Sequence, residues 1–154
     1  SFPTRRSSDL LGLTGVETGE VVLGLCEKIR PDAIIAIDSL VSRKLSRLCR
    51  TIQLSDTGIT PGGGIAPGRF PLDEQTLHTP VLALGIPMVV EARTLAADLC
   101  PNAPPEEELP PTSLIVTPKD IDALMVKSAK ILGYAIDMAL HTHLSVEDIE
   151  SLLS

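Results

Sequence analysis

The chain has 154 residues and a net charge of −7, from 13 Lys and Arg against 20 Asp and Glu. Hydrophobic residues make up 44% of it and aromatic residues 2%. The hydrophobic fraction excludes a disordered chain and is enough for the core of one domain, or of part of a larger one. The acidic balance and the scarcity of aromatic rings argue against binding to nucleic acid or to an anionic membrane surface.

The first ten residues differ from the rest of the chain. They show no hydrophobic period and resemble a translated sequencing adapter. We expect this stretch to be an artefact and the protein sequence to begin at Leu11, as a C-terminal fragment. No signal peptide is recognisable, no apolar run is long enough to cross a bilayer, and three widely spaced cysteines suit a reducing compartment. These features predict a cytoplasmic protein.

Helical and strand patterns alternate from Leu11 to Cys100. The first helix is expected to end before Pro31 and to have Thr14 or Thr18 as its N-cap. A loop rich in glycine and proline is expected at 57–71. In chain order the predicted elements are a helix through Val21–Ile29, a buried strand at 32–38, a helix at 40–48, a half-buried strand at 51–56, a buried strand at 80–87 closed by proline, and a helix at 89–99.

This alternation, without hairpin signals, predicts an α/β core at 11–100 with a mostly parallel sheet flanked by helices. The stretch 101–113, rich in Pro and Glu, is expected to be a linker that cannot join a sheet. The remainder, 114–154, is expected to add a strand and helices that pack on the core. Its long helix is expected to open with Thr117 as cap and to carry an apolar stripe from Ile121 to Leu140, and a last helix is expected at 146–153.

Asp38 is the first candidate site residue. It follows the apolar run Ile34–Ile37, so we expect it at the carboxyl edge of a central strand, where ligands bind in open α/β sheets. A carboxylate with apolar neighbours there suits proton transfer. The alternative is that Asp38 only caps the following helix, and position alone favours the cap.

Asp56 is the second candidate, because Asp56-Thr57-Gly58 has the triplet of the pepsin-like aspartic proteases. Those enzymes are all-β and need two copies of the triplet, so that fold is excluded. Asp56 is expected either beside Asp38 at a strand end or in a turn that opens the glycine loop. The loop at 60–68 lacks the Lys and the following helix of a phosphate-binding loop, so a substrate loop or a plain surface loop is expected.

Arg43 belongs to a basic cluster with Arg47 and Arg50 at helical spacing. The cluster is either a solvated helix face or a site where Arg43 receives a carboxylate from an acidic substrate. His141 and His143 have no third ligand at a known spacing, so no zinc site is expected. No metal and no cofactor are expected.

Several longer motifs, in order, resemble the germination protease family of spore-forming Firmicutes over Leu11 to His141. The resemblance implies an α/β, three-layer fold similar to the hydrogenase maturation proteases. It also implies an atypical aspartic endopeptidase, made as a zymogen and assembled as a homo-oligomer, that degrades small acid-soluble spore proteins in the spore core during germination. The segments that carry it are Leu13–Thr18, Lys28–Leu40, Thr51–Gly64, Leu84–Val90 and Val116–Asp122.

The resemblance implies two essential carboxylates. One lies in an Ala-Ile-Asp segment, which corresponds to Asp38 and favours catalysis over capping for that residue. The other belongs to a Pro-Asp-Ala-Leu-Gly-like segment that the 154 residues do not contain, so we expect the fragment itself to be inactive. Asp56 remains a secondary candidate, and Arg43 or a neighbour is expected to bind the Glu side chain at which the family prefers to cut.

Two other functions stay open at this point. One is a non-catalytic α/β binding or assembly module, in which Asp38 and Asp56 only cap and turn. The other is a small-molecule enzyme of phosphorylase-like fold, which would need a phosphate-binding cluster of Ser and Arg.

Overall fold

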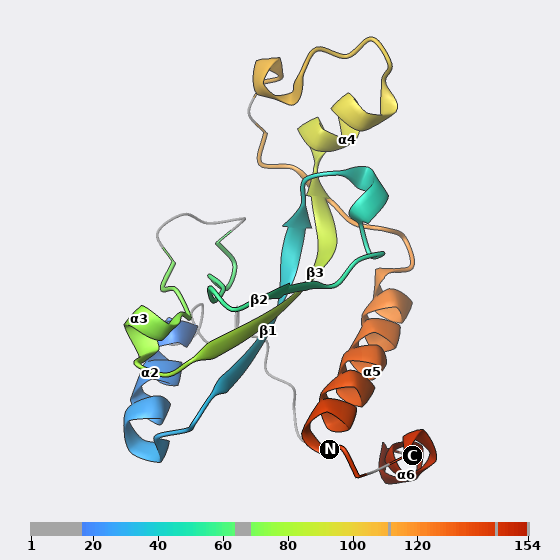
Figure 1. Cartoon of the computed structure of the whole chain (residues 1–154). Coiled ribbons are helices and arrows are strands. Elements are labelled where there is room, and N and C mark those ends of the chain that lie inside the picture. The colour runs from blue at the N-terminus through green and yellow to red at the C-terminus, as the bar shows by residue number, and fades with distance from the viewer. Residues whose placement is uncertain (1–16, 64–68, 111, 144, 154) are drawn as a thin grey trace. The chain divides into compact units, whose positions relative to one another are not determined.

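The structure is a computed structural model that describes residues 17–63, 69–110, 112–143 and 145–153. It contains two compact units, Ser1–Val116 and Thr117–Ser154 (Figure 1), which are described separately. The stretch 1–10, the proposed cap Thr14 and residues 64–68 of the glycine loop lie outside the described residues.

The first unit is built on a mixed four-stranded sheet in the order β1-β3-β2, with β4 also paired to β3. β1 and β3 are parallel, whereas β2 and β4 run antiparallel to β3. The predicted α/β class is therefore right, but the mostly parallel sheet is wrong for the described residues. The short connection from β1 to β2 contains no crossover helix, and a parallel partner would need one. The strands are β1 (Ile34–Ser42), β2 (Gln53–Ser55), β3 (Val81–Glu91) and β4 (Ile115–Val116).

The predicted helix at 40–48 is wrong, because β1 continues through Leu40 to Ser42. Leu40 lies over Gly85 of β3, and Ser42 is buried, so this part of the chain is held by strand pairing. Beyond it only a short 3₁₀ helix forms, η1 (Leu45–Arg47). The spacing of Leu40 and Leu48 fits either a helix or a strand, and pairing with β3 decides for the strand.

β3 also runs beyond its predicted end at Pro87. The register shifts at this point, because Leu40 pairs with Pro87 and Val41 with Val89, which leaves Met88 as an extra residue. A proline is tolerated at such a bulge, where the ladder of hydrogen bonds is already interrupted. The helix that was expected from residue 89 therefore begins later, as α4 (Ala92–Leu99).

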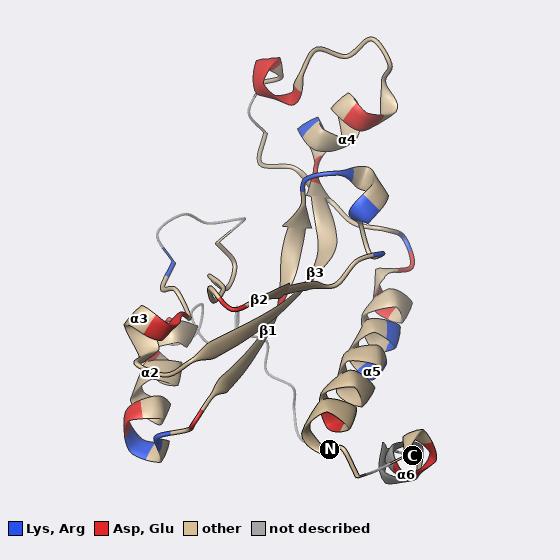
Figure 2. Ribbon diagram, in the orientation of Figure 1, with Lys and Arg blue, Asp and Glu red and all other residues tan. Residues whose placement is uncertain are grey.

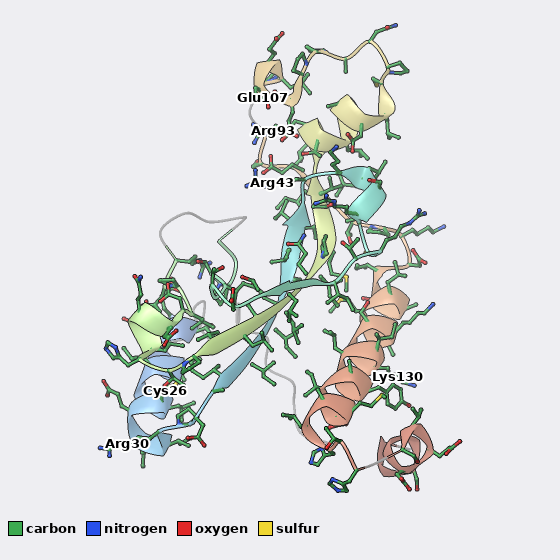
Figure 3. The ribbon with its side chains drawn as sticks, in the orientation of Figure 1. Cys26, Arg30, Arg43, Arg93, Glu107 and Lys130 are labelled. Atoms are coloured by element: carbon green, nitrogen blue, oxygen red, sulfur yellow. The ribbon has the colours of Figure 1, made fainter. Side chains whose placement is uncertain are left out.

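The predicted first helix is confirmed as α2 (Thr18–Ile29), but its N-cap is Glu17. The N–H of Glu17 donates to Glu20 Oε2 at 3.1 Å, which forms one half of a capping box. Thr18 is the first helical residue and does not cap the helix. Figure 3 shows Cys26 and Arg30 toward the C-terminal end of α2, where Arg30 adopts the left-handed conformation that ends the helix.

The core of the first unit lies where α2 and α3 (Glu74–Leu77) pack beside the N-terminal halves of β1 and β3 (Figure 1). Phe70 lies against Gly19 so closely that a Cβ there would be 2.6 Å from the Cγ atom of its ring. The start of α2 is thereby joined to the end of the glycine loop. The buried core residues are Ala36, Leu72, Leu77 and Val81, with Val22, Leu23, Ile34, Ile59 and Phe70 packed against them.

The charges lie mostly away from these strands. In Figure 2 most of β1 and β3 is uncharged, whereas basic positions follow β1 and acidic positions gather at η2 (Glu106–Glu108). Apolar side chains on the sheet also face solvent, with Ile37 54% and Leu54 66% exposed. β1 was expected to be central, but within the described residues β3 is the central strand and β1 is an edge strand.

The second unit consists of α5 (Ile121–Leu140) and α6 (Val146–Leu153), which contact each other. Both helices were predicted. Asp120, rather than Thr117, holds the N-cap position of α5. At the start of α6, hydrogen bonds from the N–H and hydroxyl of Ser145 hold the pKa of Asp148 below its usual value. No helix in the described ranges is long and apolar enough to cross a membrane.

Gly85 tests whether the β1–β3 pairing organises the first unit. We expect Gly85→Val to lower the free energy of unfolding by about 1–3 kcal/mol, because its Cβ would meet the side chain of Leu40. The control is Gly24→Ala in α2, where a Cβ meets nothing within 4 Å. This change is expected to raise the free energy of unfolding by about 0.5–1 kcal/mol, because alanine favours the helix over glycine. Urea unfolding measures both changes, and equal effects of the two variants would contradict this role of Gly85.

Candidate functional site

Asp38 lies in the middle of β1, opposite Gly85 of β3, and its side chain is half-buried. The predicted position at the strand edge is wrong, because β1 continues to Ser42. No helix begins at Asp38, so the capping alternative is also wrong. Its Oδ1 accepts the N–H of Ser39 at 2.9 Å, and its Oδ2 accepts the N–H of Gly62 at 3.2 Å. The carboxylate is thus fixed by two backbone donors, one of them from the glycine loop.

A two-residue clasp closes the base of the glycine loop. Ile59 N donates to Leu72 O at 3.0 Å, and Leu72 N donates to Ile59 O at 2.8 Å. Gly58 precedes the clasp with a φ of +84°, and a Cβ there would be 2.7 Å from the Cβ of Asp73. Asp73 caps α3 by accepting the N–H of Thr76 at 2.8 Å. Hydrogen bonds from the hydroxyl and N–H of Thr76 hold the pKa of Asp73 below its usual value.

The near end of the loop is a tight turn over Thr60-Pro61-Gly62-Gly63. Gly63 N donates to Thr60 O at 2.9 Å, and Gly62 has a φ of +67°. Proline followed by a glycine of positive φ is the signature of a type II turn. The N–H of Gly62 does not close this turn, and it donates to Asp38 instead.

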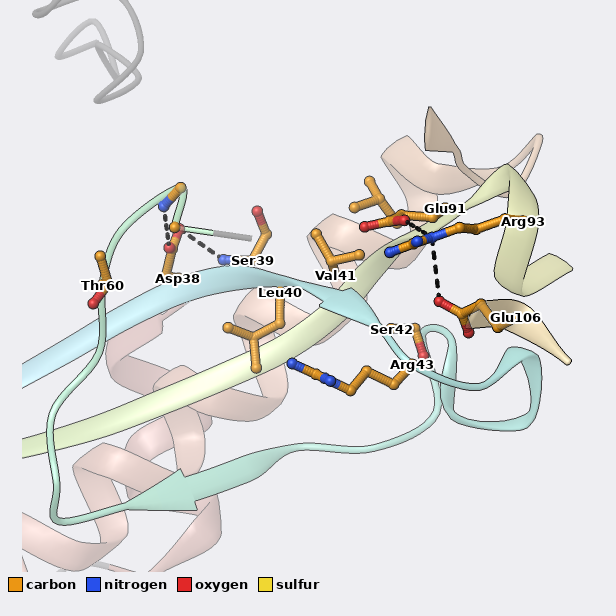
Figure 4. A pocket seen from close by; sticks show the side chains of 13 residues that line it. Asp38, Ser39, Leu40, Val41, Ser42, Arg43, Thr60, Glu91, Arg93 and Glu106 are labelled. Carbon is orange, nitrogen blue, oxygen red and sulfur yellow. Dashed lines mark hydrogen bonds and ion pairs between the residues drawn. The ribbon is translucent and has the colours of Figure 1, made fainter. Parts of the chain in front are cut away.

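Asp38 lines a pocket of about 320 Å³, shown in Figure 4. The pocket wall comes from β1, the turn at 60–63, the end of β3, the start of α4, and η2. A carboxylate has about four lone-pair positions, and the two backbone donors use two of them. The other two remain for a water or for a donor on a bound molecule. The arrangement therefore suits proton exchange with a small group that enters the pocket.

The predicted cation Arg43 also lines the pocket, but it follows the end of β1 and is not on a helix. The predicted helical basic face is wrong, since Arg47 lies in η1 and Arg50 lies in the turn after it. Arg43 is exposed at the pocket, and within the described residues it forms no ion pair. Its guanidinium is therefore available to an anionic ligand.

Three charged residues of the pocket were not anticipated. Arg93 Nε lies 2.7 Å from Glu91 Oε2 and 3.4 Å from Glu106 Oε1. Glu91 was not predicted at the site because β3 was expected to end at Pro87. Glu106 was not predicted there because 101–113 was interpreted as a linker. No local pattern joins Arg93 to Glu106. The turn Thr60-Pro-Gly-Gly, in contrast, carries a recognisable type II signature and could have been assigned.

Asp56 lies apart from Asp38. β3 separates β1 from β2, and Asp56 follows the end of β2 without lining the pocket. It is an exposed residue in a turn where Ser55 Oγ and Thr57 Oγ1 are 2.6 Å apart in a hydrogen bond. The expected position beside Asp38 is therefore wrong, and among the described residues the Asp56 side chain forms no hydrogen bond with the glycine loop.

Within the described part of the chain, no group of three or more His, Cys, Asp or Glu side chains is arranged to hold a metal ion. The rings of His141 and His143 meet edge to face, with centroids 6.2 Å apart.

Comparison with known proteins identifies the family. The profile of peptidase family A25, germination protease, matches residues 6–101, which is more than half of the chain. The chain belongs to the germination protease family. The match begins within the stretch 1–10 that was expected to be an artefact. The recognition of this family from the sequence is confirmed.

Curated relatives agree with this assignment. The germination protease of Clostridium perfringens is 39% identical over an aligned stretch of 175 positions, gaps included. The alignment covers 94% of this chain and 54% of the relative. That of Clostridium tetani is 39% identical over 178 residues, with 96% and 55% covered. That of Bacillus pumilus is 48% identical over 92 residues, or 60% of this chain and 25% of the relative. The chain spans about half the length of the first two relatives.

Gly58 and Gly62 provide a matched test of the loop. We expect Gly58→Ala to cost more than Gly62→Ala in free energy of unfolding. Both variants force alanine into positive φ, at about 1–2 kcal/mol each, but only at Gly58 does the new Cβ also collide with the Leu72–Asp73 backbone. Urea unfolding measures the difference. An equal or smaller cost at Gly58 would show that the clasp does not hold the loop.

Proposed function

We propose that this chain supplies one carboxylate of a peptidase active site, Asp38, in an endopeptidase that degrades small acid-soluble spore proteins at germination. Membership of the germination protease family supports proteolysis. The observation that carries the role of Asp38 is its half-buried carboxylate, oriented by two backbone donors at a pocket large enough for a side chain.

The proposed reaction is the hydrolysis of a peptide bond by an activated water. Asp38 accepts a proton from the water as the water oxygen attacks the carbonyl carbon of the substrate. A second carboxylic acid donates a proton to the carbonyl oxygen, which gives a tetrahedral intermediate with two hydroxyl groups. As this intermediate collapses, Asp38 gives its proton to the leaving nitrogen, and the second carboxylate takes a proton from a hydroxyl group, so that the amine and the acid product are released. The N–H groups of Ser39 and Gly62 hold Asp38 in place during these steps, because each donates a hydrogen bond to one of its carboxylate oxygens.

The second carboxylate is implied by the family resemblance and lies in a segment that the 154 residues do not contain. A single carboxylate lacks the acid that protonates the substrate. We therefore propose that the 154-residue chain alone does not turn over substrate. The same proposal covers four properties of the whole protein. These are a homo-oligomeric assembly, a location in the spore core, synthesis as a zymogen and a sheet like that of the hydrogenase maturation proteases.

The family match favours the peptidase over the phosphorylase-like alternative. The assembly-module alternative differs from the peptidase in one respect, since it gives Asp38 no part in turnover. The substitution of Asp38 therefore separates these two functions.

The first prediction from this proposal concerns the substitution of Asp38. In a complete relative that has aspartates at the positions aligned with Asp38 and Asp56, changing the first of them to Asn is expected to lower kcat for a small acid-soluble spore protein by about 10²–10⁴-fold, because a proton acceptor is lost. The matched control is the same change at the position aligned with Asp56, which lies outside the pocket; kcat within about threefold of the parent is expected, as for a solvated turn residue.

Circular dichroism of each variant checks that its secondary structure is retained. Unchanged turnover of the Asp38-equivalent variant would overturn the catalytic role and favour the assembly module. Efficient cleavage by the 154-residue chain itself would overturn the proposal that it is inactive.

The second prediction concerns Arg43. We propose that it binds an acidic side chain of the substrate, since it is exposed at the pocket that Asp38 lines. In a complete homologue with arginine at the aligned position, Arg43→Ala is expected to lower kcat/KM about tenfold for a Glu-containing peptide. For the same peptide with Gln in place of Glu, kcat/KM of the variant is expected to change little. An equal loss for both peptides would contradict the assignment.

A further inference from the structure

Arg93 is the most constrained cation of the Asp38 pocket. It lies in the first turn of α4, between Glu91 at the end of β3 and Glu106 in η2 (Figure 4). Both ion pairs use its Nε atom. The two Nη groups form no hydrogen bond or ion pair with any other described residue. A guanidinium has five N–H donors, so the outer fork of Arg93 retains its capacity for bidentate binding of a carboxylate.

The two carboxylates on Arg93 differ in how firmly they are held. Glu91 is two residues away in sequence and pairs at 2.7 Å, at the junction of β3 and α4. Glu106 comes from the segment between α4 and β4 and pairs at 3.4 Å, with about a third of its side chain exposed. An ion pair with about a third of both side chains exposed contributes little free energy, because water screens it. Glu106 is therefore the carboxylate that can be exchanged.

Charge balance in the pocket favours exchange over simple addition. Asp38, Glu91 and Glu106 face two guanidinium groups, those of Arg43 and Arg93, so the five lining residues carry one net negative charge. An added carboxylate would raise that charge, whereas a carboxylate that replaces Glu106 leaves it unchanged. Like-charge repulsion is costly in a partly enclosed site.

The segment that carries Glu106 is held at both ends. α4 contacts η2, and Ala92 N donates to Leu114 O at 3.0 Å next to the β3–β4 pairing. The tether keeps Glu106 near Arg93 at a high effective concentration and still allows it to leave and return. Figure 3 shows Glu107, the next residue of η2, in the same region as Arg93.

We propose that Arg93 is a specificity-determining residue that binds the carboxylate side chain of an acidic peptide through its outer fork, and that Glu106, paired with the Nε of the same guanidinium, competes for Arg93 until the peptide displaces it. This inference deepens the proposed peptidase function and rests on it. Glu91 keeps Arg93 oriented throughout, and Glu106 acts as an internal competitor that sets the affinity of the pocket for acidic peptides.

The test measures peptide binding to the 154-residue chain, so it does not need turnover. The probes are the peptide Ala-Ala-Glu-Ala-Ala-Ala, with blocked ends, and the same peptide with Gln. Dissociation constants come from chemical-shift titration of the ¹⁵N-labelled chain at low salt. The variants are Glu106→Gln, Arg93→Gln and Arg93→Lys. The matched control is Glu107→Gln, which removes the same charge from η2 at a residue that does not line the pocket.

We expect Glu106→Gln to bind the Glu peptide about two- to sixfold more tightly, because the competing half-exposed ion pair is removed. Glu107→Gln is expected to stay within about 1.5-fold of the parent chain, as for a screened surface charge. Arg93→Gln is expected to bind the Glu peptide about tenfold more weakly and to lose most of the preference for Glu over Gln, because only Arg43 then remains to bind the carboxylate. Arg93→Lys is expected to restore the preference only in part.

Equal effects of Glu106→Gln and Glu107→Gln would overturn the inference, because they would show a general charge effect. A retained preference for Glu in Arg93→Gln, or no binding of the Glu peptide to any variant, would overturn it as well. These failures are distinct from failure of the peptidase proposal, which is decided by turnover in the Asp38-equivalent variant of the complete relative.

Discussion

The hydrogen bond from the N–H of Gly62 to Oδ2 of Asp38 joins the glycine loop to the sheet, and the candidate site is built around it. On one side of the bond, β1 fixes the backbone of Asp38 through its pairing with β3. On the other side, the type II turn at 60–63 leaves the Gly62 N–H free to donate. The clasp between Ile59 and Leu72 holds that turn near the strand.

The pairing of β1 with β3 also shapes the pocket. Gly85 has no side chain, so Leu40 can lie over it beside Asp38. The bulge at Met88 allows β3 to pass Pro87 and reach Glu91. That extension brings Arg93 and the acidic η2 to the same pocket as Asp38. The charged end of the site thus depends on one glycine and one bulge in the same strand.

Sequence reasoning found the elements whose patterns are local. The apolar periods of α2 and α5 stand out from their polar neighbours, and the apolar runs of β1 and β3 are continuous in the sequence. The expectation that β1 is buried was wrong, because Ile35 and Ile37 on one face of this edge strand are exposed. The predicted helix at 40–48 was wrong because the spacing of its leucines fits either a helix or a strand. The strand forms because β1 pairs with β3 and Leu40 packs over Gly85. The end expected at Pro87 failed because a proline at a bulge looks, in sequence, like a proline after a strand.

The candidate site divides in the same way. Asp38 was found from its place after an apolar run and from the family resemblance, although its position within the strand and its contact with Gly62 were not foreseen. Arg43 was found as a cation, but on the wrong element. The contact between Arg93 and Glu106 spans residues on α4 and η2 that share no pattern, so it could be found only in three dimensions.

The contact between Gly62 and Asp38 can be measured most directly by hydrogen–deuterium exchange at the Gly62 amide of the ¹⁵N-labelled chain. Exchange of that amide is predicted to be about tenfold faster in Asp38→Ala than in the parent chain, because the substitution removes the acceptor of its hydrogen bond. Equal exchange rates in the two chains would contradict the account of how the loop and the strand form the site.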